Sequence, residues 1–235
     1  MRDTSTRSAK LGSGLVLGGA SLAALTTWLI FAWTPIEATQ GVIQRIYYVH
    51  IPVAWLAELS FVMSALFSAG YLWLRDERAD AAAAVSAEGG MYMASALLIV
   101  GPLWGRVAWG TYWTWEPRLT LTLLLYFIFI GYFMVRGATS DPGRARRFSA
   151  VVAIVGALDV PLIHMSVYWF RSLHPQPVVL RPDGPTADAR IVVTLLASLL
   201  AYTLLFAGLW WFRYVAEMTE RDRRRSPPLL QGGAA

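Results

Sequence analysis

The chain has 235 residues, of which 56% are hydrophobic and only 15% are charged. A soluble domain carries nearer a quarter of charged residues, so this composition excludes an ordinary soluble protein and indicates an integral membrane protein. The chain has no cysteine, which excludes disulfides, thiol chemistry and iron–sulfur ligation by its own residues. The net charge of +5 does not require a nucleic-acid partner, because arginines in loops orient membrane proteins.

Six apolar stretches are long enough to cross a bilayer, since a spanning helix needs about 20 residues. They lie at about 11–33, 51–74, 85–103, 119–135, 148–170 and 191–212. The first is longer than a usual signal-peptide core and has no convincing cleavage site, so we interpret it as a retained span. The sequence predicts an all-α polytopic membrane protein, a single domain over residues 1–235 with a basic tail at 213–235.

The basic residues are unequally shared between the two sides of these spans. With the N-terminus inside, 14 of the 20 lysines and arginines fall in the inner segments. The positive-inside rule therefore predicts that both termini are cytoplasmic and that the loop between the third and fourth spans faces outward. The basic tail is expected to contact lipid headgroups or a cytoplasmic partner.

The loop between the third and fourth spans reads Trp-Gly-Thr-Tyr-Trp-Thr-Trp-Glu-Pro-Arg-Leu-Thr at positions 109–120. It is too aromatic for a flexible loop and too polar for a span. We interpret residues 109–115 as an aromatic shelf at the membrane surface, carried by Trp109, Tyr112, Trp113 and Trp115, and preceded by Trp104. The structural alternative is an aromatic belt that only anchors two spans at the headgroups.

An aromatic surface beside cations suits a large, flat, apolar ligand with acidic groups, and haem is the obvious candidate. Arg118 is the best placed cation for the two haem propionates, followed by Arg106, Arg45 and Arg171. For each of the last three, an arginine that reaches the lipid headgroups is an equally good interpretation.

All three histidines fall in the outer half of the predicted molecule. His50 begins the second span and His174 follows the fifth, so both lie at the depth of the aromatic shelf. Imidazole is a common axial ligand of haem iron, which makes this pair the candidate ligands, although either could be a polar tip among aromatics. His164 lies deeper, within the fifth span, and fits a helix–helix hydrogen bond, or a supporting contact behind the haem-binding residues, better than ligation.

Few charged residues lie within the predicted spans, where they are costly. Glu58 and Asp159 could line a polar path or form hydrogen bonds between helices, and we favour the second interpretation. Together with Glu88 and His164 they are the only candidates for a permeation path.

Three separated segments resemble the tryptophan-rich WWD group of haem-handling membrane proteins, and in particular the CcmC family. They are 48–55 around His50, 101–120 with the aromatic shelf, and 160–174 with His164 and His174. The resemblance covers nearly the whole chain. It implies that His50 and His174 are axial ligands of the haem iron, and that Trp109, Trp113, Trp115 and Arg118 form the signature; these residues match the family's motif.

The resemblance also implies a function. Such proteins are non-enzymatic subunits of the bacterial inner membrane that hold haem b at the periplasmic face. They deliver it to the haem chaperone CcmE for c-type cytochrome maturation, together with the small protein CcmD and the ABC transporter subunits CcmA and CcmB. Two alternatives stay open: a CcsA-like or CcmF-like haem-lyase component, usually larger, and a permease subunit of an ABC-type exporter.

This sequence departs from the family's pattern at one place. Glu116 stands where the family has aspartate, and Pro117 where a small residue is usual. Proline is acceptable in the first turn of a helix, and a helix N-terminus favours the negative charge before it. We therefore expect Glu116 to cap the fourth span or to meet the chaperone, and its loss to spare haem binding.

Overall fold

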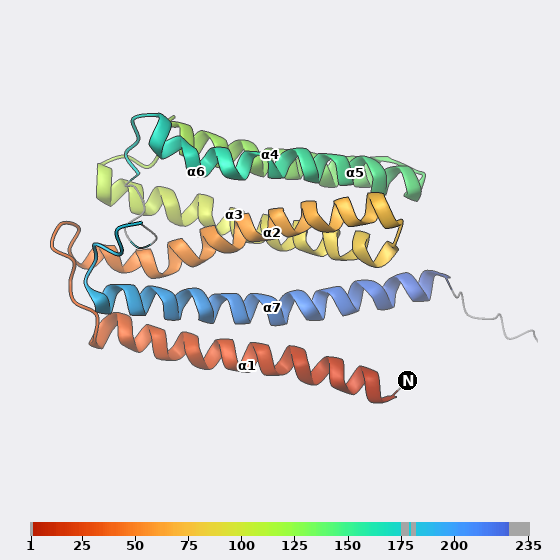
Figure 1. The fold of residues 1–235 in the computed structure, drawn as a ribbon, viewed down its shortest axis with the longest axis horizontal. Helices are drawn as coiled ribbons and strands as arrows, with labels where there is room; N and C mark the ends of the chain where they lie inside the picture. The colour runs from red at the N-terminus through yellow and green to blue at the C-terminus, as the bar shows by residue number, and fades with distance from the viewer. Residues whose placement is uncertain (1, 175–178, 180–181, 226–235) are drawn as a thin grey trace, which may run out of the picture.

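The computed structural model describes residues 2–174, 179 and 182–225, which form helices joined by loops (Figure 1). The elements are α1 (Arg2–Ala32), the 3-10 helix η1 (Val42–Ile46), α2 (Tyr47–Leu74), α3 (Glu77–Trp109), α4 (Pro117–Ala138), α5 (Pro142–Ala157), α6 (Asp159–Trp169) and α7 (Ala189–Arg225). Among these described residues, six helical segments are long and apolar enough to cross a membrane, with η1 joined to α2 and α5 to α6. The predicted all-α polytopic fold is confirmed.

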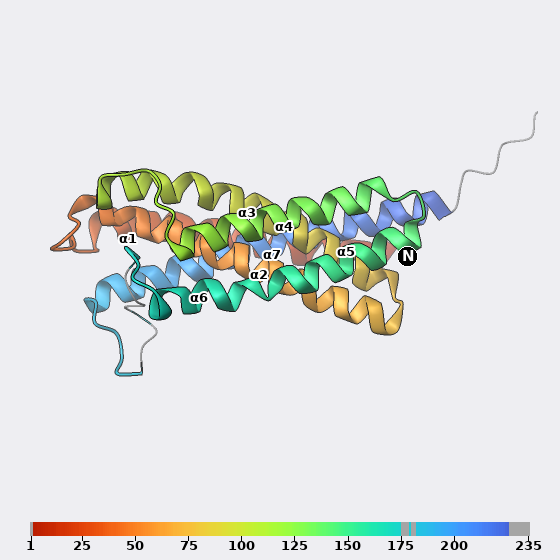
Figure 2. The same ribbon diagram turned by 90° about the horizontal axis from the view of Figure 1, so that it is seen from above.

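The helices run along one long axis and pack mainly side by side. α1 lies at the edge against α7, α7 contacts α2 and α3, and α4, α5 and α6 cover the other side of the α2–α3 pair (Figure 1). Seen from above, the loops that follow α3 and α6 lie at one end of the bundle and the N-terminus at the other (Figure 2). This places the predicted aromatic shelf and both outer histidines at the end opposite the N-terminus.

Small residues bring the helices close together. A Cβ on Gly90 of α3 would lie 2.6 Å from the ring of Phe61 in α2, and Phe61 in turn stacks on Phe129 of α4 with ring centroids 4.0 Å apart. On the edge helix, a Cβ on Gly19 would lie 2.6 Å from the backbone nitrogen of Leu205 in α7. Glycine at such contacts lets helix backbones approach, which is how spans associate where the hydrophobic effect gives little help.

The fifth predicted span is two helices rather than one. Residues 148–170 were expected to form a single helix, but α5 ends at Ala157 and α6 begins at Asp159, with Leu158 between them. Pro161 lies one turn further on, where it lacks the N–H that would bond back to Ala157 and its ring crowds that carbonyl. The break therefore follows from this proline.

The last helix is longer than its predicted span. α7 continues from the expected end at Phe212 to Arg225, and residues 226–235 of the predicted tail lie outside the described residues. Its extension pairs with α3, because Arg213 contacts Glu88 at 2.9 Å and Arg225 contacts Glu77. The described part of the basic tail is therefore held against the bundle.

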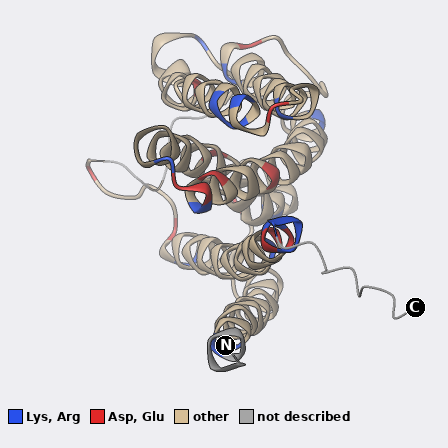
Figure 3. Ribbon diagram, turned by 90° about the vertical axis from the view of Figure 1, so that its right-hand side faces the viewer, with Lys and Arg blue, Asp and Glu red and all other residues tan. Residues whose placement is uncertain are grey.

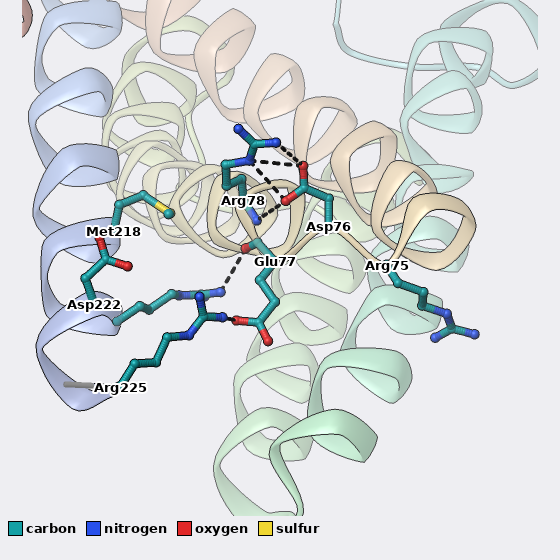
Figure 4. A pocket seen from close by; sticks show the side chains of 8 residues that line it. Arg75, Asp76, Glu77, Arg78, Met218, Asp222 and Arg225 are labelled. Atoms are coloured by element: carbon teal, nitrogen blue, oxygen red, sulfur yellow. Dashed lines mark hydrogen bonds and ion pairs between the residues drawn. The ribbon is translucent and has the colours of Figure 1, made fainter. Parts of the chain in front are cut away.

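The end opposite the aromatic shelf gathers charged residues from α3, α4, α5 and α7 (Figure 3). Asp80 is buried at its centre and accepts from Arg136 at 2.8 and 2.7 Å and from Arg221 at 2.9 Å. An adjoining cavity of about 420 Å³ is lined by further pairs, among them Asp76 with Arg78 (Figure 4). Because these charges pair with one another, this end ties four helices together.

Candidate haem site

The aromatic shelf begins where α3 stops. Trp109 is the last residue of α3, and Gly110 follows in the left-handed conformation with φ of 79°, which glycine adopts without strain. Residues 110–116 are not helical, and α4 begins with Pro117 in its first turn as predicted. The shelf is therefore an irregular segment held at both ends by spanning helices.

The rings of the shelf differ in exposure. Trp113 and Trp115 meet edge to face with ring centroids 5.7 Å apart, as expected for two residues on the same side of an extended segment. Trp115 is 76% exposed and Tyr112 is 58% exposed, and Arg106 lies over the Tyr112 ring while donating to the Gly110 carbonyl. The outer rings therefore offer apolar area to a ligand, a membrane or a partner.

His174 is held by the acid at the end of the shelf. Nδ1 of His174 bonds to Oε1 of Glu116, and Oε2 of the same carboxylate accepts from Ser172 Oγ at 2.8 Å and from the Leu173 N–H at 2.7 Å. The side chain of Glu116 makes no cap for α4, so that part of the expectation was wrong. The carboxylate instead joins two loops that are far apart in sequence.

The ionisation of this pair follows from its surroundings. Burial opposes the charge on Glu116, but the hydrogen bonds from Ser172, His174 and the Leu173 N–H outweigh it and hold the pKa of Glu116 below its usual value. Burial lowers the pKa of His174 in spite of Glu116, and Arg118 lowers it further. Near pH 7 the pair is therefore a carboxylate and a neutral imidazole.

His50 has a different environment. It is only 9% exposed in the first turn of α2, and its ring meets the edge of Trp104 with centroids 5.0 Å apart. The indole N–H of Trp104 donates to Gln40 at 3.0 Å, which fixes the indole. Nδ1 of His50 is buried and has no hydrogen-bond partner in the described part of the chain.

The two outer histidines and Arg118 come together although they belong to three segments. His50 lies within electrostatic range of both His174 and Arg118, and His174 lies within range of Arg118. Trp109 covers His174 edge to face, with centroids 4.8 Å apart. Within residues 2–174, 179 and 182–225, the guanidinium of Arg118 has no hydrogen bond or ion pair.

The third histidine also lies within electrostatic range of Arg118, but its ring is bound to a different residue. Nε2 of His164 in α6 bonds to Oε2 of Glu58 in α2 at 2.7 Å, which is the helix–helix hydrogen bond that the sequence suggested for both residues. Asp159 is buried, and one of its carboxylate oxygens has no partner among the described residues. Of the remaining candidate cations, Arg45 lies over the ring of Phe31, 4.9 Å from its centroid.

Two residues that support the candidate site were not singled out from the sequence. Gln40 supports Trp104 behind His50, and Ser172 bonds to Glu116 beside His174. Ser172 stands two residues before His174, which was a usable signal, because short side-chain bonds within loops are common for serine. Nothing in the sequence around Gln40 indicated its contact.

The site suits a planar, apolar, metal-bearing dianion. It offers two imidazoles, several aromatic faces, an unpaired guanidinium, and a buried Trp113 N–H that lacks a partner in the described residues. Haem needs axial nitrogen ligands, apolar contact and cations for its propionates, and these residues supply each kind of group. Across the described ranges no group of three or more His, Cys, Asp or Glu residues could hold a bare metal ion.

Comparison with known proteins agrees with this chemistry. The family model described as "CcmC: Heme exporter protein C" matches residues 4–227. "Heme exporter protein C" of Bradyrhizobium diazoefficiens is 37% identical over 200 residues, covering 85% of this chain and 74% of that protein. The protein of the same name from Rhodobacter capsulatus is 33% identical, over 81% of this chain and 79% of its own. A "putative cytochrome c biosynthesis ccmC-like mitochondrial protein" of Arabidopsis thaliana is 28% identical, over 78% and 69%.

Proposed function

The chain belongs to the CcmC family of haem exporter proteins, and we propose that it holds haem b at the periplasmic face of the bacterial inner membrane and delivers it to a CcmE-like chaperone. It is a haem-handling component of cytochrome c maturation and not an enzyme. CcmD-like and CcmA/CcmB-like subunits are its proposed partners. Haem is its cargo, and the chain supplies the groups that bind and orient it.

One observation carries this proposal: His50 and His174 lie within electrostatic range of each other beside the aromatic shelf although they are 124 positions apart in the sequence. Each comes from a different segment, yet each lies against a tryptophan, Trp104 for the first and Trp109 for the second. Two imidazoles in such a place suit six-coordinate haem iron. The unpaired Arg118 is the proposed partner of a propionate, because guanidinium binds carboxylates through two parallel hydrogen bonds.

The distribution of charge along the bundle supports the proposed orientation. The four-helix ion network around Asp80 lies at the end that also holds the N-terminus and the end of α7 (Figure 3). If the positive-inside rule holds, this end is cytoplasmic and the aromatic shelf is periplasmic. Haem on the shelf would then be accessible to a periplasmic chaperone.

The permease alternative finds little support in the spans. Glu58 pairs with His164, and Glu88 pairs with Arg213; both pairs join two helices. Asp159 is buried next to the apolar core residue Val160. Glu58, His164 and Glu88 are thus engaged between helices, and Asp159 is the one candidate whose side chain has no partner among the described residues.

Ligation is tested by the visible spectrum of the purified protein. We expect the Soret and α bands of bis-histidine haem, lost or strongly altered in His50→Ala and in His174→Ala. His164→Ala is the matched control, because its ring is bound to Glu58 and it should keep the wild-type spectrum. A normal spectrum in the double variant of His50 and His174 would refute the assignment.

Delivery is tested separately from binding. Trp113→Ala combined with Trp115→Ala removes two contacting rings of the shelf and should weaken haem retention and abolish transfer to a co-expressed CcmE-like chaperone. Covalent haem on the chaperone, scored by haem stain, measures transfer. Trp73→Ala is the control, because this exposed tryptophan lies at the opposite end of α2. Normal transfer by the double variant would reduce the shelf to a membrane anchor.

A further inference from the structure

We propose that Glu116 is a positioning residue for His174, which presents Nε2 of that imidazole to the haem iron. This support makes His174 the more tightly bound of the two axial ligands, so that His50 is the ligand released first. This inference rests on the proposed function, in which His50 and His174 hold the iron. It goes further because it assigns unequal roles to the two ligands and a new role to the acid of the shelf.

The contacts of Glu116 are those of a fixed group. Both carboxylate oxygens are used, Oε1 by His174 Nδ1 and Oε2 by Ser172 and the Leu173 N–H. The side chain of Glu116 is only 8% exposed, and that of His174 is 21% exposed. The backbone N–H of His174 also bonds to Ser172 Oγ at 3.1 Å, so the loop around the histidine is fixed from two sides.

The identity of the acceptor sets the tautomer of His174. An ionised carboxylate has no proton to give, so Nδ1 of the neutral imidazole must carry the hydrogen in this bond. Nε2 then keeps its electron pair and is free to bind a metal. A carboxylate behind a metal-binding histidine fixes the ring and makes it a stronger electron donor.

His50 lacks this support. Its Nδ1 is buried without a hydrogen-bond partner among the described residues, and its ring is fixed only by packing, chiefly against Trp104. With no acceptor behind it, His50 is the weaker donor and its tautomer is not set by a protein group. A carrier that must give up its haem gains from one firm and one releasable ligand, because the haem stays oriented while one coordination position opens.

The first experiment examines the histidine without haem. In haem-free protein labelled with ¹⁵N-histidine, the His174 signal, identified by its absence in His174→Ala, should show hydrogen on Nδ1 and an unprotonated Nε2. In Glu116→Gln the amide N–H₂ can face His174, which should move the hydrogen to Nε2. A wild-type ring with hydrogen on Nε2 would overturn the proposal whether or not any variant folds.

The second experiment examines the loaded protein. Glu116→Gln should retain haem about 10–100-fold less tightly, the usual effect of removing a carboxylate behind a metal-binding histidine. This replaces the expectation from the sequence that loss of Glu116 spares haem binding, because the contact with His174 was not foreseen. Glu116→Asp keeps the charge and should recover part of this loss. Ser172→Ala is the control for loop structure, because it removes the bonds of Ser172 to Glu116 and to the backbone N–H of His174 but leaves the imidazole bonded to Glu116. An equal loss in Ser172→Ala and Glu116→Gln would show that only loop structure matters, against the proposal.

The third experiment asks which ligand leaves. Carbon monoxide added to the ferrous protein should replace His50, so wild type and His50→Ala should give the same Fe–CO vibrational frequencies, and Glu116→Gln should shift them. If wild type instead matches His174→Ala, or if Glu116→Gln leaves haem retention and these frequencies unchanged, the inference fails while bis-histidine binding stands. If the wild-type protein itself shows no bis-histidine spectrum, the proposed function is refuted instead.

Discussion

We expect Asp80 to hold together the end of the bundle opposite the proposed haem site, and Asp80→Asn tests this. The substitution keeps the shape of the side chain but removes its charge. Asp80 is 2% exposed and binds Arg136 through two hydrogen bonds and Arg221 through one. Arg146 of α5 adds a third, longer ion pair at 3.6 Å. The variant would leave three arginines near a neutral amide, whose nitrogen cannot accept hydrogen bonds from their guanidinium groups.

The burial and the remaining partners of these arginines set how far Asp80→Asn lowers the free energy of unfolding. Removing one partner of a buried ion pair costs about 3–5 kcal/mol, because the other charge stays behind without compensation. Here the side chains of Arg136 and Arg221 are 20% and 12% exposed, and Arg221 keeps its second partner Glu217 at 2.9 Å. Partial access to water and the remaining partner reduce the penalty, so we expect about 3 kcal/mol, the lower end of that range.

The free energy of unfolding can be measured in mixed detergent micelles by titration with sodium dodecyl sulfate, followed by far-ultraviolet circular dichroism. Asp76→Asn is the matched control four residues earlier, where the carboxylate is 36% exposed and caps α3. Asparagine caps a helix as well as aspartate does, so the control should change stability by less than about 0.5 kcal/mol. The haem spectrum of Asp80→Asn should be unchanged in the folded protein, since the network and the proposed haem site lie at opposite ends.

If Asp80→Asn lowers the free energy of unfolding no more than Asp76→Asn does, the network is a set of solvated surface pairs. Such pairs are worth about 0–1 kcal/mol each. The claim that Asp80 holds four helices together at this end would then be refuted.

Three further predictions follow from other parts of the chain. A periplasm-active reporter fused after Gly110 should be active and one fused after Asp141 inactive; the reverse pattern would place the aromatic shelf on the cytoplasmic side. His164→Ala should lower stability by about 1–3 kcal/mol because it leaves a carboxylate in a span without its partner, and thermal denaturation compared with wild type would show it. Gly19→Val should lower stability by about 1–3 kcal/mol, since its Cβ would lie 2.6 Å from the α7 backbone. Gly18→Val is the control and should not lower stability, because a Cβ there would have nothing within 4 Å. Equal unfolding midpoints for the two variants would contradict the close packing of α1 on α7.

The sequence by itself determined the number of spans and the end of the bundle at which the candidate site residues lie. Hydropathy is a sum over neighbouring residues, so six apolar stretches could be read directly and six spans are found. Even there it missed the break at Leu158, because Pro161 permits either a kink or a new helix and neighbouring helices decide between them. His50, His174 and the aromatic shelf could be assigned to one end because each lies beside the outer end of a predicted span.

Only the tertiary structure decided which side chains meet. Glu116 was expected to cap α4 or to meet a partner, and it binds His174, which lies 58 residues further along the chain. Glu58 and His164 were each expected to form a hydrogen bond between helices, but only the packing of α2 against α6 made them partners of one another. A helix pattern fixes which residues share a face, but the partner of that face depends on how α2, α4 and α6 rotate and pack. That choice depends on contacts between distant segments, which composition and spacing do not contain.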